Sequence, residues 1–240
     1  MSIIPRPIRN LVERLIEPIV AALIRAKVSP NVITTISTMV VLGAGVAFGL
    51  GRVRLGGALL LLSGLGDMLD GRVARGGARV TPFGAFYDST LDRVGDAALF
   101  GGIAIYFVRG GVPTYLATWG LAAALVALSA TLIVSYARAR AEGLSLDCKV
   151  GIAQRAERIL GLGVPSLFVG AGPDGLVLFG IVGVLALLST ITVAQRIAHV
   201  RAITRVAEAP PADGPRTARK TQARQLTPDM AEFTKERNLQ

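Results

Sequence analysis

Cysteine and aromatic residues are scarce in this sequence, and each shortage excludes a class of site. Cys148 is the only cysteine in the 240-residue sequence, which rules out an intramolecular disulfide and a cysteine-rich metal site. Aromatic residues make up 5% of the chain, too few for a platform on which nucleotide bases stack. Although the net charge is +10, we therefore expect no nucleic-acid partner, and we assign no role to Cys148.

Long apolar runs dominate what is present. Hydrophobic residues make up 52% of the sequence, and several runs approach the roughly 20 residues that a helix needs to cross a bilayer. Glycine- and proline-rich turns separate the runs. We predict an all-α, polytopic membrane protein with six transmembrane helices, at about residues 31–50, 56–75, 82–108, 114–141, 154–170 and 176–200.

The N-terminal segment has a different pattern. Apolar and charged residues alternate at helical spacing over about residues 8–26, and Pro18 is expected to kink this helix. The pattern predicts an amphipathic helix on the cytoplasmic membrane surface, although an ordinary helix packed on the bundle fits it equally well. We divide the chain into a juxtamembrane helix at 1–28, a six-helix domain at 29–205 and a polar, disordered cytoplasmic tail at 206–240.

Basic residues are distributed unequally between the connecting segments. The turns assigned to the outer side hold only Arg52, Arg54 and Arg109, whereas the inner segments and the tail hold most of the others. This bias places both termini on the cytoplasmic side and favours contact with anionic membrane lipids. Since the first residues lack an organelle-targeting pattern, we expect a prokaryotic plasma membrane.

Acidic residues interrupt the apolar runs at one place. Asp67 and Asp70 are i,i+3 neighbours on one expected helix, and Asp88 and Asp92 are i,i+4 neighbours on the next. An acid inside a membrane costs at least about 2.5–3.5 kcal/mol on insertion scales. A divalent metal would offset the repulsion among them, because carboxylate oxygens suit Mg²⁺ or Mn²⁺. One or two ions are expected here.

Small residues surround these acids. Gly71, Ala74 and Gly84 lie within about a turn of Asp70 or Asp88 and leave room for a ligand to approach the backbone. Arg75 adds a cation that can grip a phosphate. Buried ion pairs or polar helix–helix contacts would be the alternative explanation, but it requires all of these residues to coincide by chance.

The pattern of acids and small residues resembles the signature of the CDP-alcohol phosphotransferases. It fixes eight positions without a gap: Asp67, Asp70, Gly71, Ala74, Arg75, Gly84, Asp88 and Asp92. The resemblance implies a homodimeric membrane enzyme that transfers a phosphatidyl group from a CDP-linked lipid, such as CDP-diacylglycerol, to an alcohol and releases CMP. It also implies that the four aspartates bind the metal and that Asp92 acts as general base.

The resemblance extends to the nucleotide pocket. It implies that Gly71, Ala74, Arg75 and Gly84 line the CDP-lipid site. Asn31 and Thr34 match a Pro-Asn-x-x-Thr that the family has at this place, which adds them to the pocket; helix capping is the alternative explanation. Asp96 falls outside the signature, and we expect it to support the site as a partner of Arg93.

Arginines at the inner helix ends indicate a phosphorylated acceptor. Arg138, Arg140, Arg155, Arg158 and Arg196 would form a pocket for its phosphate; binding of lipid headgroups is the alternative for each. The segments SYARARAE, QRAERIL and AQR resemble the prokaryotic phosphatidylinositol phosphate synthases, which implies that Arg138, Arg155 and Arg196 contact the phosphate of inositol 3-phosphate. Gln154 and Ala156 depart from that pattern.

Two other functions remain open at this point. A glycerol 3-phosphate acceptor would give a phosphatidylglycerophosphate synthase with the same metal site. A transporter would instead need acids spread along a conduit on several helices, whereas these acids cluster on two adjacent ones. Metal-dependent release of CMP would separate the enzyme from the transporter.

Overall fold

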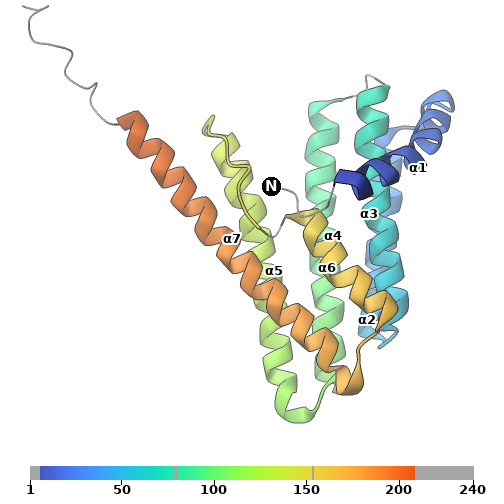
Figure 1. The fold of residues 1–240 in the computed structure, drawn as a ribbon, viewed down its shortest axis with the longest axis vertical. Coiled ribbons are helices and arrows are strands. Elements are labelled where there is room, and N and C mark those ends of the chain that lie inside the picture. Colours follow the sequence, from blue (N-terminus) through green and yellow to red (C-terminus); the bar gives the residue numbers. More distant parts are fainter. Residues whose placement is uncertain (1–5, 78–79, 153, 209–240) are drawn as a thin grey trace, which may run out of the picture. The chain divides into compact units, whose positions relative to one another are not determined.

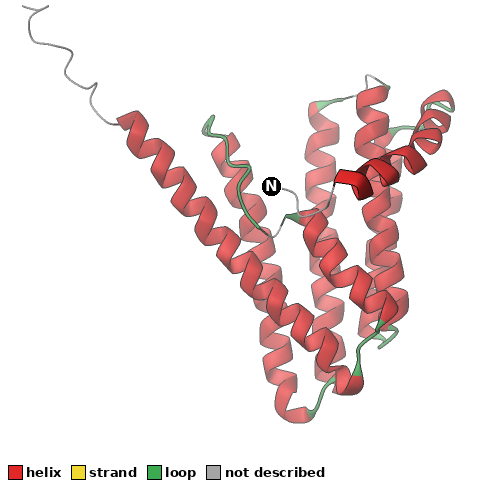
Figure 2. Cartoon of the chain, viewed as in Figure 1, coloured by secondary structure: helices red, strands yellow, loops and turns green. Residues whose placement is uncertain are grey.

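The described part of the protein is helical throughout. The computed structural model describes residues 6–77, 80–152 and 154–208, and within these ranges it contains no strand (Figure 2). Side chains are described for residues 16–77, 80–152 and 154–205. The helices are α1 (Arg6–Arg25), α2 (Pro30–Gly49), α3 (Val53–Gly76), α4 (Pro82–Tyr106), η1 (Phe107–Gly111), α5 (Thr114–Glu142), α6 (Arg155–Phe168), η2 (Pro173–Gly175) and α7 (Leu176–Glu208).

The helices begin where proline and capping residues predict. Thr81 precedes Pro82 in extended conformation, and its hydroxyl accepts a hydrogen bond from the Gly84 amide at 3.0 Å. Pro30 begins α2 in the same way, although Ser29 before it makes no side-chain cap. The structure therefore confirms the start of the helix that carries Asp88 and Asp92.

Glycines bring the central helices close together. A Cβ on Gly102 of α4 would collide with the backbone of Gly45 on α2, and a Cβ on Gly45 would collide with the backbone at Ala98. Gly57 of α3 and Gly163 of α6 make a similar close contact. Since α2 packs on both α3 and α4, the two helices that carry the acids lie against one partner (Figure 1).

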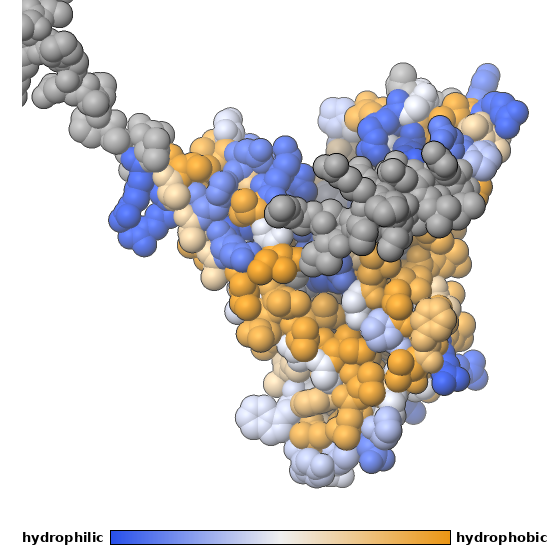
Figure 3. Space-filling view, in the orientation of Figure 1, coloured by the Kyte–Doolittle hydropathy of each residue, from blue (hydrophilic) through white to orange (hydrophobic). Residues whose placement is uncertain are grey.

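The core is built from buried residues of α2, α3, α4, α5, α6 and α7. Its fully buried large side chains include Phe48, Phe107, Leu60, Ile103 and Leu162. Many large apolar side chains lie outward instead, and Figure 3 shows apolar surface over the middle of the helices. An apolar exterior of this kind is expected where a bundle faces lipid.

Three helical segments are long and apolar enough to cross a membrane. They are Pro30–Gly49, Thr114–Glu142 and Pro173–Arg205 among the described residues. α3 and α4 have the length but carry the charges of the acidic stretch. α6 has 14 residues, and such a helix is about 21 Å long, less than the roughly 30 Å of the hydrocarbon core. The prediction of an all-α protein is confirmed for the described residues, and three of its helices have the length and composition of membrane spans. Six spans and an interfacial amphipathic helix stay predictions.

The two ends of the chain lie partly outside the described residues. α1 contains Pro18 and packs against α3 (Figure 1), where Ile24 lies next to Gly76. α7 continues to Glu208, past the boundary expected at residue 205. Residues 209–240, most of the tail expected to be disordered, lie outside the described residues.

Candidate active site

The four aspartates lie on facing parts of α3 and α4. Asp67, Asp70 and Asp88 are close enough to repel one another, and Asp92 experiences the charges of Asp67 and Asp88. Thr34 of α2 donates a hydrogen bond to the Asp70 carboxylate at 2.8 Å. The structure thus brings together the acids that the sequence pattern singled out.

Arg155 at the start of α6 bridges two of these acids. Its Nη2 lies 2.7 Å from Asp67 Oδ2 and 2.7 Å from Asp92 Oδ1, and its Nε donates to Asp67 Oδ2 at 3.0 Å. One guanidinium therefore offsets part of the negative charge of the cluster. The sequence indicated Arg155 as a phosphate-binding residue. It did not indicate a pairing with Asp67 and Asp92, which precede Arg155 by 88 and 63 positions in the chain.

The donor set suits a divalent cation. Carboxylate oxygens are the ligands that Mg²⁺ and Mn²⁺ prefer, and the mutual repulsion of the acids requires a compensating positive charge. Within the described residues, however, no group of three or more acidic, histidine or cysteine side chains is arranged to hold a metal. Arg155 occupies the space between Asp67 and Asp92. The carboxylates therefore have the chemistry that a divalent metal requires. An ion can bind between Asp67 and Asp92 once the Arg155 side chain has left that space.

A cavity of about 280 Å³ opens beside Asp70 and Asp88. It is lined by every residue predicted for the nucleotide pocket, which are Asn31, Thr34, Gly71, Ala74, Arg75 and Gly84. A Cβ on Gly84 would lie 3.0 Å from the Thr81 hydroxyl and 3.3 Å from Asn31 Oδ1, and one on Gly71 would lie 3.3 Å from Arg75 Nη1. Both glycines thus keep this cavity open, and we refer to it as the donor cavity.

A second, larger cavity of about 610 Å³ lies on the other side of Asp88. The side chains that line it include four of the five predicted arginines, namely Arg138, Arg155, Arg158 and Arg196, together with Asp92. Arg140 is exposed and is not among the lining residues. We refer to this space as the acceptor cleft.

All four lining arginines have protein partners, and two of them contact groups other than the aspartates. Arg196 is buried and donates from Nε to the Val150 carbonyl at 3.0 Å and from Nη1 to the Val134 carbonyl. Arg138 pairs with Glu142 at 2.8 Å, and both side chains are half exposed. Arg196 therefore fixes the backbone that borders the cleft, while Arg138 has a partner that an incoming phosphate can replace.

The two cavities meet at one position. Ala85 and Asp88 line both the donor cavity and the acceptor cleft, whereas Asp70 lines only the former and Asp92 only the latter. A group bound in one cavity can therefore reach a group bound in the other across Asp88. This arrangement suits transfer between two substrates.

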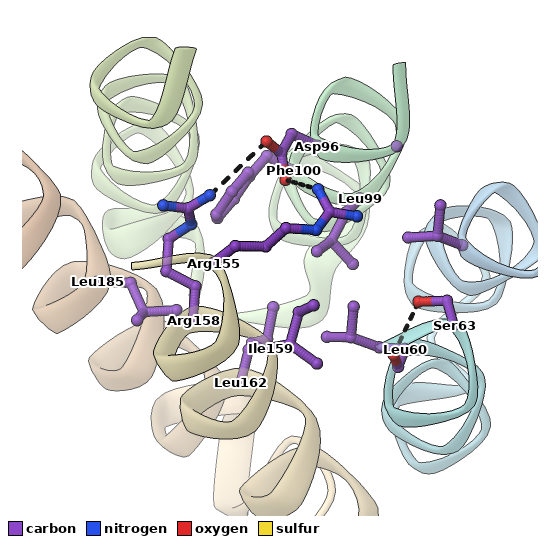
Figure 4. A pocket seen from close by; sticks show the side chains of 12 residues that line it. Leu60, Ser63, Asp96, Leu99, Phe100, Arg155, Arg158, Ile159, Leu162 and Leu185 are labelled. Carbon is purple, nitrogen blue, oxygen red and sulfur yellow. Dashed lines mark hydrogen bonds and ion pairs between the residues drawn. The ribbon is translucent and has the colours of Figure 1, made fainter. Parts of the chain in front are cut away.

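Asp96 continues the acidic face of α4 by one more turn. It lies 3.8 Å from Arg93, as the sequence predicted, and also 3.8 Å from Arg155 and from Arg158 (Figure 4). Sequence reasoning missed the last two contacts. The i,i+4 spacing of Asp88, Asp92 and Asp96 was the available signal, but α6, which supplies both arginines, is distant in the chain.

Comparison with protein families identifies the class of this protein. The model of the CDP-alcohol phosphatidyltransferase family matches residues 27–194. The chain belongs to this family, and it is therefore a membrane-associated transferase.

The relatives narrow the class. Phosphatidylinositol phosphate synthase of Cutibacterium acnes is 43% identical over 196 residues, which cover 78% of this chain and 93% of that enzyme. Archaetidylinositol phosphate synthase of Methanothermobacter thermautotrophicus is 43% identical over 152 residues, or 63% of this chain and 71% of the relative.

Solved structures give the same answer. Phosphatidylinositol phosphate synthase of Mycobacterium tuberculosis with CDP-DAG bound is similar with a TM-score of 0.66 at 30% identity, covering 77% of this chain and 92% of that one. The same enzyme in complex with manganese and citrate gives 0.63 at 31% identity, covering 75% and 86%. The resemblance drawn from the sequence is confirmed at the level of the family and of these relatives.

Proposed function

We propose that this protein transfers a phosphatidyl group from CDP-diacylglycerol to inositol 3-phosphate and releases CMP. The observation that carries the proposal is the meeting of the donor cavity and the arginine-lined acceptor cleft at Asp88. The names of the relatives, which include an enzyme solved with CDP-DAG, support both substrates.

The donor cavity supplies the groups that a CDP-lipid requires. Arg75 provides a positive charge for the diphosphate, and Asn31 and Thr34 provide polar groups from α2. Gly71, Ala74 and Gly84 leave the space that the nucleotide fills. The cavity lies among helices whose outer surface is apolar, so acyl chains can remain in the lipid while the headgroup enters.

Asp67, Asp70, Asp88 and Asp92 would hold Mg²⁺ or Mn²⁺, as one or two ions. A relative solved in complex with manganese supports this assignment. When bound, the metal supplies positive charge to the diphosphate and stabilises the CMP leaving group. Thr34 orients Asp70 for this role through its hydrogen bond.

Asp92 is the best placed general base. Among the four acids it lines the acceptor cleft without lining the donor cavity, so its carboxylate faces the side from which the acceptor hydroxyl approaches. It would take the proton of that hydroxyl as the oxygen attacks the phosphorus in line with the departing CMP.

Clustered positive charge favours a phosphorylated acceptor. Arg138, Arg155 and Arg158 surround the cleft, and Arg196 holds its border. Inositol carries no charge and would leave these arginines without an anionic ligand, and serine carries an ammonium group beside its single carboxylate. Glycerol 3-phosphate carries the same phosphate and is the second candidate; the names of the relatives favour inositol phosphate.

The membrane arrangement forms part of the proposal. It comprises six transmembrane helices at 29–205, α1 at the cytoplasmic interface and a cytoplasmic tail at 206–240. The active site faces the cytoplasm, and the enzyme is a homodimer in the plasma membrane. Three segments with the length and composition of membrane spans and the clustering of arginines near the site support the membrane arrangement.

Release of CMP by the purified protein tests the reaction. We expect release with CDP-diacylglycerol, Mn²⁺ or Mg²⁺, and inositol 3-phosphate, and none with inositol or serine. Asp92→Asn, which cannot accept the proton, serves as the blank. Release with glycerol 3-phosphate alone would retain the metal site and reject the proposed acceptor, whereas folded protein without release under any condition would reject the proposed reaction.

A further inference from the structure

A buried acid, Asp96, lies one helical turn along α4 from Asp92 and faces three arginines. Asp96 lines a small cavity of about 20 Å³ together with Arg155 and Arg158 (Figure 4). The charged nitrogens of Arg93, Arg155 and Arg158 each lie 3.8 Å from its carboxylate oxygens. These distances are too long for hydrogen bonds, which need about 2.7–3.2 Å.

Several hydrogen-bond donors and acceptors in this cluster have no hydrogen-bond partner among the residues that the structure describes. Within the described part of the chain, Asp96 Oδ2, Arg155 Nη1 and Arg93 Nε are buried without a hydrogen-bond partner. An unmade hydrogen bond at a buried polar atom is destabilising, because the atom has lost water without gaining a partner. The arrangement around Asp96 would therefore gain from a shift of roughly 1 Å by either partner.

Arg155 is the partner that can make this shift. Its side chain is 27% exposed, against 7% for Arg158 and 10% for Asp96. Arg93 is 32% exposed and lies 3.4 Å from Asp92, but Arg155 is the arginine that bridges Asp67 and Asp92. Its Nη2 contacts Asp67 and Asp92, while its Nη1 points toward Asp96. A pivot of the same guanidinium away from Asp67 and Asp92 would bring Nη1, which has no hydrogen-bond partner among the described residues, to hydrogen-bonding distance of Asp96 Oδ1. The other carboxylate oxygen, Oδ2, faces Arg93 and Arg158.

We propose that Asp96 is a positioning residue that receives Arg155 when a metal ion binds Asp67 and Asp92. The inference rests on the proposed function, because it requires the metal site. Binding of the cation removes the counter-charge role of Arg155 at Asp67 and Asp92, and the two cations would repel each other. Asp96 supplies the anionic partner without which Arg155, Arg93 and Arg158 would form a cluster of like charges beside the metal.

The exchange also prepares the acceptor cleft. Arg155 lines this cleft, but while it bridges Asp67 and Asp92 its donors are directed to protein carboxylates. Release from them, with one nitrogen held by Asp96, leaves the other donors available to the acceptor phosphate. Metal binding and acceptor binding are then coupled through one side chain.

Mn²⁺ affinity, measured without either substrate, tests the exchange. The full-length protein in detergent is compared with Asp96→Asn, Arg155→Gln and the double variant by electron paramagnetic resonance of free Mn²⁺. Arg155→Gln should bind Mn²⁺ more tightly, because no arginine must be displaced. Asp96→Asn should lower Mn²⁺ affinity both in the wild-type protein and in the Arg155→Gln protein. The factor by which it lowers the affinity should be at least about fivefold larger in the wild-type protein, a coupling typical of contacting groups.

Three controls keep the result interpretable. Asp174→Asn removes the same charge at an exposed turn and should leave Mn²⁺ affinity unchanged. Asp96→Glu retains the charge and should restore most of the affinity lost in Asp96→Asn. Thermal unfolding and size-exclusion chromatography identify any variant that does not fold, and Arg155→Lys then replaces Arg155→Gln, since a lysine cannot span two carboxylates with a planar fork.

The outcomes separate this inference from the proposed function. Equal weakening by Asp96→Asn in both backgrounds would show a simple loss of nearby charge or packing and would overturn the exchange. Failure of the wild-type protein to bind Mn²⁺ would overturn the metal site itself, and the exchange with it.

Discussion

At the scale of single residues, the carboxylates of the site are oriented by side chains from other helices. Asp70 on α3 is held by Thr34 of α2, and Asp67 and Asp92 are held by Arg155 of α6. We propose these acids as metal ligands, and a neighbour such as Thr34, which would stay in place when a metal binds, orients ligands of this kind. Substitution of a neighbour therefore tests the site while leaving all four acids in place.

Thr34→Val should weaken metal binding. Valine has nearly the same shape but lacks the hydroxyl that donates to Asp70, and loss of a partner of a metal ligand typically costs about 10- to 100-fold in affinity or activity. We expect the loss in Mn²⁺ affinity and in CMP release to lie near the lower end of this range.

Thr38→Val is the matched control on the same helix. The Thr38 hydroxyl donates to the Thr34 carbonyl at 2.9 Å, one turn away from the acids, so its loss should leave Mn²⁺ affinity nearly unchanged. If both substitutions lowered Mn²⁺ affinity equally, the loss would come from a change in α2 as a whole and not from the missing hydrogen bond to Asp70.

At the scale of helices, the close approach of α2 and α4 sets the position of the site. Gly45 and Gly102 permit backbone contact at a level below the acids, and Asp88 and Asp92 continue along α4 from there. Thr35 and Tyr87 add a polar contact of 2.9 Å between the same two helices near the donor cavity. A wider separation of α2 from α4 would therefore also move the walls of that cavity.

Gly102→Val should destabilise the bundle and lower activity together. The added side chain meets the backbone of Gly45, and overpacking of a core typically costs about 1–3 kcal/mol. Thermal unfolding in detergent and CMP release measure the two effects. Gly101→Val places the same residue where no atom lies within 4 Å, and an equal loss in this control would rule out helix separation as the cause.

At the scale of the whole molecule, the described chain has an apolar exterior and polar cavities within. Large apolar side chains remain exposed on α2, α5 and α7, while charged residues line the acceptor cleft. Such a surface is compatible with lipid around the helices. Orientation in the membrane is a prediction that labelling can test, because Cys148 is fully buried and should not react.

Single introduced cysteines should report opposite sides of the membrane. Arg109→Cys lies in a predicted outer turn and Arg140→Cys near the inner end of α5, and both positions are exposed. A membrane-impermeant maleimide should label Arg109→Cys in intact cells and Arg140→Cys only after permeabilisation. The reverse pattern would invert the topology, and labelling of the unmodified protein would contradict the burial of Cys148.

Patterns within one segment were predictable from sequence, whereas contacts between distant segments were not. Thr81 and Pro82 mark the start of α4, and the spacing of Asp67 and Asp70 indicates a shared face, because capping and helical periodicity act over a few residues. The bridge from Arg155 to Asp67 depends on the packing of α6 against α3. No local rule specifies that packing.

The arginines illustrate the same limit. All five lie near helix ends that the sequence predicts to be cytoplasmic, yet Arg196 donates to backbone carbonyls and Arg140 lies outside the cleft. Charge alone indicates that anions are attracted to this end of the molecule. Which guanidinium is directed to a ligand and which to the protein depends on carbonyls and carboxylates that folding brings near it.

The narrow junction of the two cavities has a consequence for the order of events during turnover. The donor cavity and the acceptor cleft share only Ala85 and Asp88 among their lining residues, so occupation of one leaves the other accessible. Under the proposed function, both substrates can then reside on the enzyme together, in either order of arrival. We expect the group to be transferred directly between them, without a covalent intermediate on the protein.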